Sequence, residues 1–330
     1  MPINKDQRIE TLRGIAIILM VAGHVIGNVS TEGLRVSDDS FYRYFYYSFK
    51  YLRMPLFTVI SGFVYSMRPL EKGKLGYFLR GKARRLILPL FTVSTIHFLT
   101  QTIVPNINTP TQLINIWKIY LFPFQHFWFL QAIFLVFIIT AVIDYFELQE
   151  TIKKWLFCLF IVIILYLFIK HPINFFSFNK ALYLLPFFIL GCGLSRFGNQ
   201  LKTPLITTFS LVFFSATIIT QQLIWFNQFQ LQTCYTPILS ISVGLSGTFL
   251  LIQFRKKINI LASLGFYSYA IYLFHVFFSA GSRIALKGIG ITNTDISFPL
   301  GLTCALLFPI IIEKILLKDK ILKRLFLGLR

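Results

Sequence analysis

The sequence has few charged residues, and acidic residues are especially scarce. Only 13% of the 330 residues are Asp, Glu, Lys or Arg, whereas soluble domains average about 25%. The hydrophobic share is 56% and the mean hydropathy is +0.70. A chain with so little polar surface must place most of its side chains against lipid or other helices. These shortages exclude a soluble globular domain and predict an integral membrane protein.

Cysteine is also scarce, and its placement argues against two kinds of site. The four cysteines, at 158, 192, 234 and 304, stand singly in apolar segments, without a CxxC pair or a histidine at ligand spacing. Disulfide frameworks and zinc sites need paired or clustered Cys and His residues. We interpret the four cysteines as small buried hydrophobic residues and predict no metal site.

The shortage of acids leaves a net charge of +20. The Lys and Arg residues occur in short clusters between apolar runs, as in the cytoplasmic loops of membrane proteins. The sequence therefore predicts membrane lipids, and not nucleic acid, as a partner. The first apolar run follows Glu10 and Arg13 and contains no small-x-small cleavage site, so we expect no cleavable signal peptide.

Apolar runs of membrane-spanning length occur ten times, since about 20 mostly apolar residues cross a bilayer as a helix. They lie near 10–30, 44–67, 86–104, 123–143, 154–170, 179–197, 204–225, 235–254, 260–281 and 296–317. The polar stretches near 30–43 and 68–85 are expected to be loops. The predicted fold is all-α: one polytopic membrane domain over residues 1–330 with about ten transmembrane helices.

The distribution of basic residues predicts the orientation of these helices. With the N-terminus in the cytoplasm, 23 of the 32 Lys and Arg residues fall on the cytoplasmic side. Cytoplasmic loops are enriched in these residues. We therefore expect both termini in the cytoplasm, which an even number of helices also requires.

Two ionisable residues, Arg13 and His24, interrupt the first apolar segment. Ionisable groups inside a bilayer are costly and are functional candidates by default. Eleven helical residues turn through roughly 1100° and rise roughly 16 Å, so both side chains share one face. Arg13 is expected near the cytoplasmic edge and His24 deeper, toward the outer half. The alternatives are that Arg13 extends to lipid headgroups and that His24 is a hydrogen-bonded packing residue.

Later segments contain further candidates of the same kind. Arg53 begins an Arg-Met-Pro-Leu-Phe run, and Pro55 is expected to break regular helical bonding there, roughly level with His24. His126 precedes a Phe-Trp-Phe-Leu run, and His275 ends the stretch that begins at Ser268-Tyr269. His97 and His171 are interpreted as ordinary core or interfacial residues.

A basic cluster, Arg80-Gly-Lys82-Ala-Arg84-Arg85, follows the second segment. Such a cluster usually marks the cytoplasmic side. It is also suited to binding the phosphates of a cytoplasmic cofactor, because Arg matches phosphate oxygens bidentately. Both interpretations place the cluster in the cytoplasm.

Taken in chain order, these blocks resemble the acyltransferase type 3 family of bacterial membrane proteins. The run from Glu10 through Arg13-Gly14 to His24 is similar to the first helix of that family. The other similar blocks are Met54–Phe57 with Ser61-Gly62, Lys82–Pro89, His126–Leu130 and Ser268–His275. Together they span most of the chain.

The resemblance implies a ten-helix bundle in the bacterial inner membrane that uses acyl-CoA, most often acetyl-CoA, as the donor. The implied acceptor is a sugar or lipid-linked glycan such as an O-antigen, exopolysaccharide or capsule precursor. Two positions depart from the pattern. The family's Arg-x-x-Arg is Lys82-x-x-Arg85 here, and Ile133 stands where many members have Glu. The sequence is therefore closer to the fucose O-acetylase-like branch.

Residue roles follow from this resemblance together with ordinary chemistry. His24 is expected to act as the general base or as a transient acyl carrier. Arg53 would stabilise the oxyanion or bind the acceptor. His126 and His275 would orient His24. The CoA phosphates would be held by Arg13, Lys82, Arg84 and Arg85.

The alternative function is a multi-pass transporter or flippase for a lipid-linked sugar or small solute. Transporters often carry internal repeats with helix breaks at matching positions. The sequence has no such repeat, and Pro55, Pro186 and Pro237 do not pair between two halves. An acyltransferase is therefore the favoured function, with the oligomeric state left open.

Overall fold

The computed structural model describes residues 6–68, 70–71, 73–104, 108 and 111–330. Within them the chain is 77% helical and has no strand. This confirms the all-α class predicted from the sequence. Lys5 and Lys72, two of the basic residues counted for the orientation, lie outside the described residues.

The helices follow one another with short connections. The first half contains α1 (Gln7–Ile26), α2 (Phe41–Phe49), α3 (Arg53–Ser66), α4 (Leu75–Ile103), α5 (Lys118–Leu121), α6 (Trp128–Tyr145) and α7 (Ile152–Phe168). The second half contains α8 (Phe178–Arg196), α9 (Gly198–Leu201), α10 (Pro204–Trp225), α11 (Thr236–Gln253), α12 (Asn259–Phe266), α13 (Ser268–Gly288), α14 (Thr294–Leu316) and α15 (Lys320–Leu327). Short 3-10 turns precede α5, α6, α8 and α11, namely η1 (Leu113–Asn115), η2 (Gln125–Phe127), η3 (Phe175–Ser177) and η4 (Thr233–Tyr235).

Each of the ten predicted segments coincides with helix. Eight helical stretches in the described residues, those containing α1, α4, α6, α8, α10, α11, α13 and α14, are long and apolar enough to cross a membrane. The remaining two, α3 and α7, have 14 and 17 residues. The chain is therefore a multi-pass membrane protein, and the count of ten spanning helices stays a prediction.

Two expectations about the second and third segments are wrong. The segment 44–67 is divided into α2 and α3, and Pro55 lies in the first turn of α3. Proline is tolerated in a first turn because its missing N–H has no partner there. The stretch 68–85 is a loop only up to Lys74, since α4 begins at Leu75 and carries the basic cluster on its first turns.

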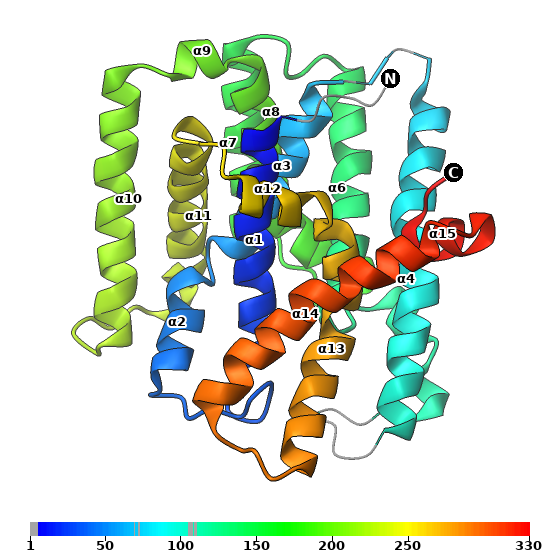
Figure 1. Ribbon diagram of the computed structural model, residues 1–330. Coiled ribbons are helices and arrows are strands. Elements are labelled where there is room, and N and C mark those ends of the chain that lie inside the picture. Colours follow the sequence, from blue (N-terminus) through cyan, green and yellow to red (C-terminus); the bar gives the residue numbers. More distant parts are fainter. Residues whose placement is uncertain (1–5, 69, 72, 105–107, 109–110) are drawn as a thin grey trace.

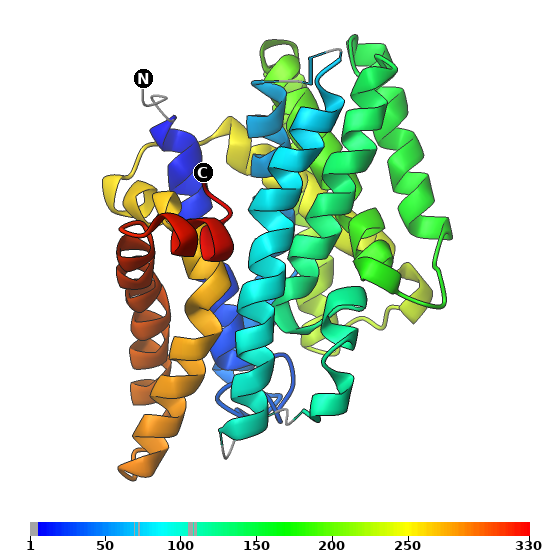
Figure 2. The same cartoon turned by 90° about the vertical axis from the view of Figure 1, so that its right-hand side faces the viewer.

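The helices form one bundle, and most of the long helices run between its upper and lower ends (Figure 1). The described N-terminal end of the chain, α9 and the start of α4 lie at the upper end, whereas the α13–α14 connection lies at the lower end. The C-terminal segment with α15, which the sequence also predicted to be cytoplasmic, lies about halfway between these ends (Figure 1), so the orientation stays a prediction. Short α15 lies across α4 rather than along it (Figures 1 and 2). Helix α10 forms an edge of the bundle, and among its residues only Gln221 is buried.

Close helix packing joins α3 to α8. A Cβ atom on Gly62 would overlap the carbonyl oxygen of Phe188, and one on Gly191 would overlap that of Val59. Small residues of this kind let two helix backbones approach each other inside a membrane. The backbones of α3 and α8 are therefore in direct contact.

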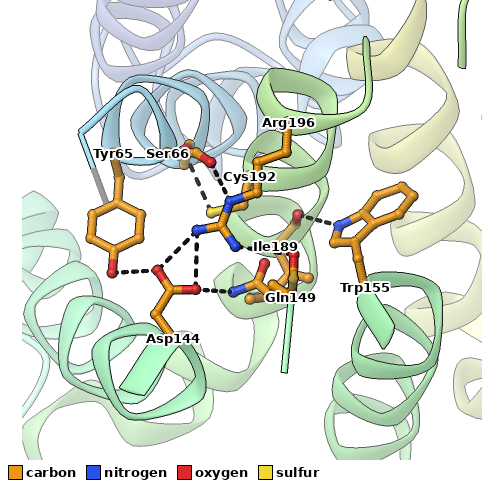
Figure 3. Close-up of polar contacts among 9 residues, drawn as sticks. Tyr65, Ser66, Asp144, Gln149, Trp155, Ile189, Cys192 and Arg196 are labelled. Atoms are coloured by element: carbon orange, nitrogen blue, oxygen red, sulfur yellow. Dashed lines mark hydrogen bonds and ion pairs between the residues drawn. The ribbon is translucent and has the colours of Figure 1, made fainter. Parts of the chain in front are cut away.

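A buried ion pair ties the upper ends of three helices together (Figure 3). Asp144 of α6 accepts two hydrogen bonds of 3.0 Å from Arg196 of α8 and one of 2.8 Å from the hydroxyl of Tyr65 of α3. Gln149 donates to the same carboxylate, and Arg196 also donates to Ser66. Because carboxylate and guanidinium are both satisfied, this network fixes the register of α3, α6 and α8.

Candidate active site

A cavity of about 530 Å³ opens among the lower ends of α1, α4 and α13 and the chain around η2. The loop after α1, Tyr46 of α2 and Arg53 of α3 complete its wall. Three of the histidines in this region line it, namely His24, His97 and His126. The cavity thus brings together residues from five distant parts of the chain.

Four imidazole rings form a continuous cluster at the cavity wall. The ring centroid of His24 lies 5.0 Å from that of His275 and 5.9 Å from that of His126. The His126 and His275 centroids are 4.8 Å apart, and His97 lies 5.9 Å from His126. The structure therefore brings together His24, His126 and His275, the three histidines that the sequence indicated as site candidates. It adds His97, which the sequence predicted to be an ordinary core or interfacial residue.

His24 is the member of this cluster that is open to the cavity. Its side chain is exposed, whereas His97, His126 and His275 are each at most 3% exposed. The exposed surface of His24 faces the cavity, because the residue lines it. Of the four, His24 is the imidazole that an entering molecule can reach.

The hydrogen bonds of His275 fix which of its nitrogens carries a proton. Its Nδ1 lies 2.9 Å from the carbonyl oxygen of Tyr272 and 3.1 Å from that of Ile271. A carbonyl only accepts, so we assign the proton to Nδ1. Nε2 is then an acceptor, and it has no hydrogen-bond partner among the described residues. A buried acceptor beside His24 is suited to hold an N–H of that ring.

His126 is held in place through its backbone. The hydroxyl of Tyr272 donates a 2.7 Å hydrogen bond to the carbonyl oxygen of His126. This bond joins α13 to the turn η2 in front of α6. The same helix therefore carries His275 and positions His126.

Arg53 lies beside His24, as the sequence predicted. Its guanidinium stacks over Tyr46 at 4.1 Å from the ring centroid and lines the cavity. It packs against Gly23, where an added Cβ would overlap Nη1 of Arg53. The glycine before His24 thus provides the space for a cation next to the imidazole.

The predicted phosphate-binding residues lie away from this cavity, and none of them lines it. Arg13 is one helix turn from Glu10, and its Nη1 donates to both carboxylate oxygens of Glu10, at 2.7 and 2.8 Å. The charge of Arg13 is therefore paired in the structure, and its predicted role in phosphate binding stays a prediction.

The basic cluster on α4 also has partners. The ammonium of Lys82 lies 3.6 Å from the ring centroid of Phe137. Arg84 donates to the carbonyl oxygen of Gly328, and Arg85 donates to that of Leu327. Arg84 and Arg85 thereby satisfy carbonyls at the C-terminal end of α15. A basic side chain is favourable there because of the helix dipole.

Two residues of the site were not among the site residues predicted from the sequence. His97 lies in the last two turns of α4, and its position within an apolar span was itself a signal. Arg283 lines the cavity from α13, which continues to Gly288, beyond the predicted boundary at 281. His171, in contrast, is exposed in the loop before α8 and hydrogen-bonds to that loop.

No group of three or more His, Cys, Asp or Glu side chains in the described part of the chain is arranged to hold a metal ion.

Comparison with known proteins identifies the family of the chain. No curated protein and no solved structure matches the sequence. A family model described as an acyltransferase domain matches residues 6–314, nearly the whole chain. The chain therefore belongs to the acyltransferase type 3 family of membrane proteins.

Proposed function

We propose that the protein is an O-acyltransferase of the bacterial inner membrane. It transfers an acyl group, acetyl in the simplest case, from cytoplasmic acyl-CoA to a hydroxyl of a cell-surface sugar or lipid-linked glycan. The observation that carries this proposal is the arrangement at His24. An imidazole open to a cavity is backed by a buried imidazole whose tautomer is fixed.

Acyl transfer to a sugar hydroxyl requires a base, because the hydroxyl is a weak nucleophile at neutral pH. Neutral His24 accepts the hydroxyl proton while the oxygen forms a bond to the thioester carbon. The carbon–sulfur bond then breaks, and the proton passes from His24 to the departing CoA thiolate. In the variant route His24 itself carries the acyl group between donor and acceptor.

The neighbours of His24 have supporting roles in this proposal. In the reacting complex Nε2 of His275, which has no partner among the described residues, accepts a hydrogen bond from His24 and leaves the other His24 nitrogen free to act as the base. Arg53 stabilises the oxyanion that forms at the thioester carbonyl. His126 packs against both rings and holds them in place.

The donor phosphates are assigned to Arg13, Lys82, Arg84 and Arg85. Arg13 is about 16 Å from His24 along α1. In the structure its guanidinium is bound to Glu10, and Arg84 and Arg85 are bound to the end of α15. Donor binding at this site therefore requires the phosphates to replace these contacts.

The test uses the purified full-length protein in nanodiscs with radiolabelled acetyl-CoA. CoA release and label transfer are followed for wild type, His24→Ala and Arg13→Ala, with His171→Ala as a matched histidine control. We expect His24→Ala to lower turnover by roughly 10²- to 10⁴-fold, the usual contribution of a general base. Arg13→Ala should raise KM for acetyl-CoA, and His171→Ala should behave as wild type.

The opposite result would change the assignment. If the wild-type protein neither bound nor cleaved any short acyl-CoA, even with candidate sugars present, the donor assignment would be wrong. Transport of a lipid-linked sugar or solute would then become the leading function. Equal activity of His24→Ala and wild type would remove His24 from the chemistry.

A further inference from the structure

The cavity beside the histidine cluster contains more positive than negative charge. Arg53 and Arg283 line it, and Glu32 is the acidic residue in its wall. The carboxylate of Glu32 accepts a 3.2 Å hydrogen bond from the backbone N–H of Asn28. A third cation, Arg35, lies at the rim, where it donates to Asn108 of the cavity wall.

Among the described residues, Arg283 has no partner for its charge. The sequence contains 12 acidic residues, and all of them lie in the described part of the chain. None forms an ion pair with Arg283, and no described residue accepts a hydrogen bond from it. Arg53 is likewise stacked on Tyr46 without a carboxylate. Two partly enclosed guanidinium groups thus share one cavity with a single carboxylate.

An enclosed cation without a counter-charge is unfavourable, and an anion that enters beside it relieves that cost. The planar guanidinium of Arg matches carboxylate and phosphate oxygens with two parallel hydrogen bonds. The rest of the wall includes the aromatic side chains of Tyr46 and Trp128 and the polar side chain of Asn108. Apolar faces combined with a few polar groups are typical of a small-molecule site.

We propose that the acceptor is a sugar carrying an anionic group, either the carboxylate of a uronic acid or a phosphate, and that Arg283 binds this group. The inference rests on the proposed function and narrows its acceptor. Arg283 lies eight residues after His275 on α13, which is about 12 Å along the helix axis. The charged group is therefore held toward the lower end of α13, while a hydroxyl of the same molecule reaches His24.

The experiment compares three acceptors with acetyl-CoA in nanodiscs: methyl glucoside, methyl glucuronide and glucose 1-phosphate. The first two differ only in whether C6 is a hydroxymethyl group or a carboxylate. For wild type we expect kcat/KM at least tenfold higher with one of the anionic acceptors than with methyl glucoside. The preferred acceptor distinguishes carboxylate from phosphate. Arg283→Gln should reduce the ratio of anionic to neutral kcat/KM at least tenfold, and Arg283→Lys should reduce it less.

The matched control is Lys287→Gln, which removes an exposed cation one turn later on α13 and should leave the ratio unchanged. Equal kcat/KM for charged and neutral acceptors in wild type would overturn the inference while leaving the acyltransferase function intact. If none of the three acceptors supports CoA release, the proposed function fails. The inference about Arg283 is then tested separately, by measuring how tightly the anionic sugars bind. Labelled methyl glucuronide or glucose 1-phosphate should then bind wild type at least tenfold more tightly than Arg283→Gln, and equal binding would refute the proposal.

Discussion

At the scale of single residues, Gly23 determines where the cation of the site stands. Gly23→Ala adds a methyl group that would overlap Nη1 of Arg53, which is the far end of a flexible side chain. We expect the guanidinium to move away from His24 and turnover to fall about a hundredfold, the usual effect of losing one oxyanion donor. The measurement is CoA release, together with thermal unfolding of the same samples.

The control for this prediction is Gly76→Ala on α4, where an added Cβ meets nothing within 4 Å. Alanine is a better helix former than glycine by up to about 1 kcal/mol, so neither substitution should lower the unfolding temperature. Gly23→Ala with wild-type turnover would mean that the position of Arg53 does not matter for the reaction.

Single residues were also the scale at which the sequence was most informative about the site. An ionisable group in an apolar run is unusual enough to identify His24, Arg53, His126 and His275, and the structure places all four together. His97 is also an ionisable residue in an apolar run, but it was predicted to be an ordinary core or interfacial residue. One sequence does not show which helix faces point toward each other. The partnership of Arg13 with Glu10 was visible in the i, i+3 spacing.

At the scale of helices, the ion pair of Asp144 and Arg196 holds α3, α6 and α8 together at one end. Asp144→Asn removes the negative charge and leaves Arg196, whose side chain is 19% exposed, without a counter-charge. Loss of one member of an enclosed pair costs about 3 kcal/mol. We therefore expect a lower unfolding temperature in detergent, measured by tryptophan fluorescence during heating.

The matched control is Glu150→Gln, the same acid-to-amide change at an exposed position six residues later. Surface substitutions of this kind change stability by less than about 0.5 kcal/mol. Similar unfolding temperatures for Asp144→Asn and Glu150→Gln would show that the network does not stabilise the bundle.

Hydropathy located the helices but not their interruptions. The breaks between α2 and α3 and between α12 and α13 fall inside apolar segments, where the composition does not change. The start of α4 differs from the prediction because its first turns contain many basic residues, and a polar stretch of this kind predicts a loop. Boundaries of this kind depend on packing against neighbouring helices, which a hydropathy pattern does not contain.

At the scale of the whole molecule, the predicted orientation has a direct test. The excess of Lys and Arg predicts that both termini lie in the cytoplasm. A C-terminal fusion to a fluorescent protein that folds only in the cytoplasm should fluoresce, and a fusion to a periplasmic phosphatase should be inactive. Fusions after Asn227, in the loop following α10, should give the reverse pattern. The same pattern at both positions would refute the predicted orientation.

The sequence predicted the class of the whole molecule because composition alone separates membrane from soluble chains. It did not predict the bundle's arrangement, since close pairs such as α1 with α12 and α3 with α8 join distant parts of the chain. Glycines are common in membrane helices, and a glycine in the sequence does not show which helix packs against it.

The union of α3 with α8 also constrains how the protein is made. Helix α3 has 14 residues, fewer than the roughly 20 that span a bilayer unaided, and it carries Arg53 at its start. About 110 residues separate its end from the start of α8, which corresponds to roughly 5 to 20 s of translation. During that interval the ribosome-bound chain provides the contacts of α3 with α1 but not those with α8. We therefore expect this short, charged helix to stay beside α1 at the insertion machinery until α8 has been synthesised.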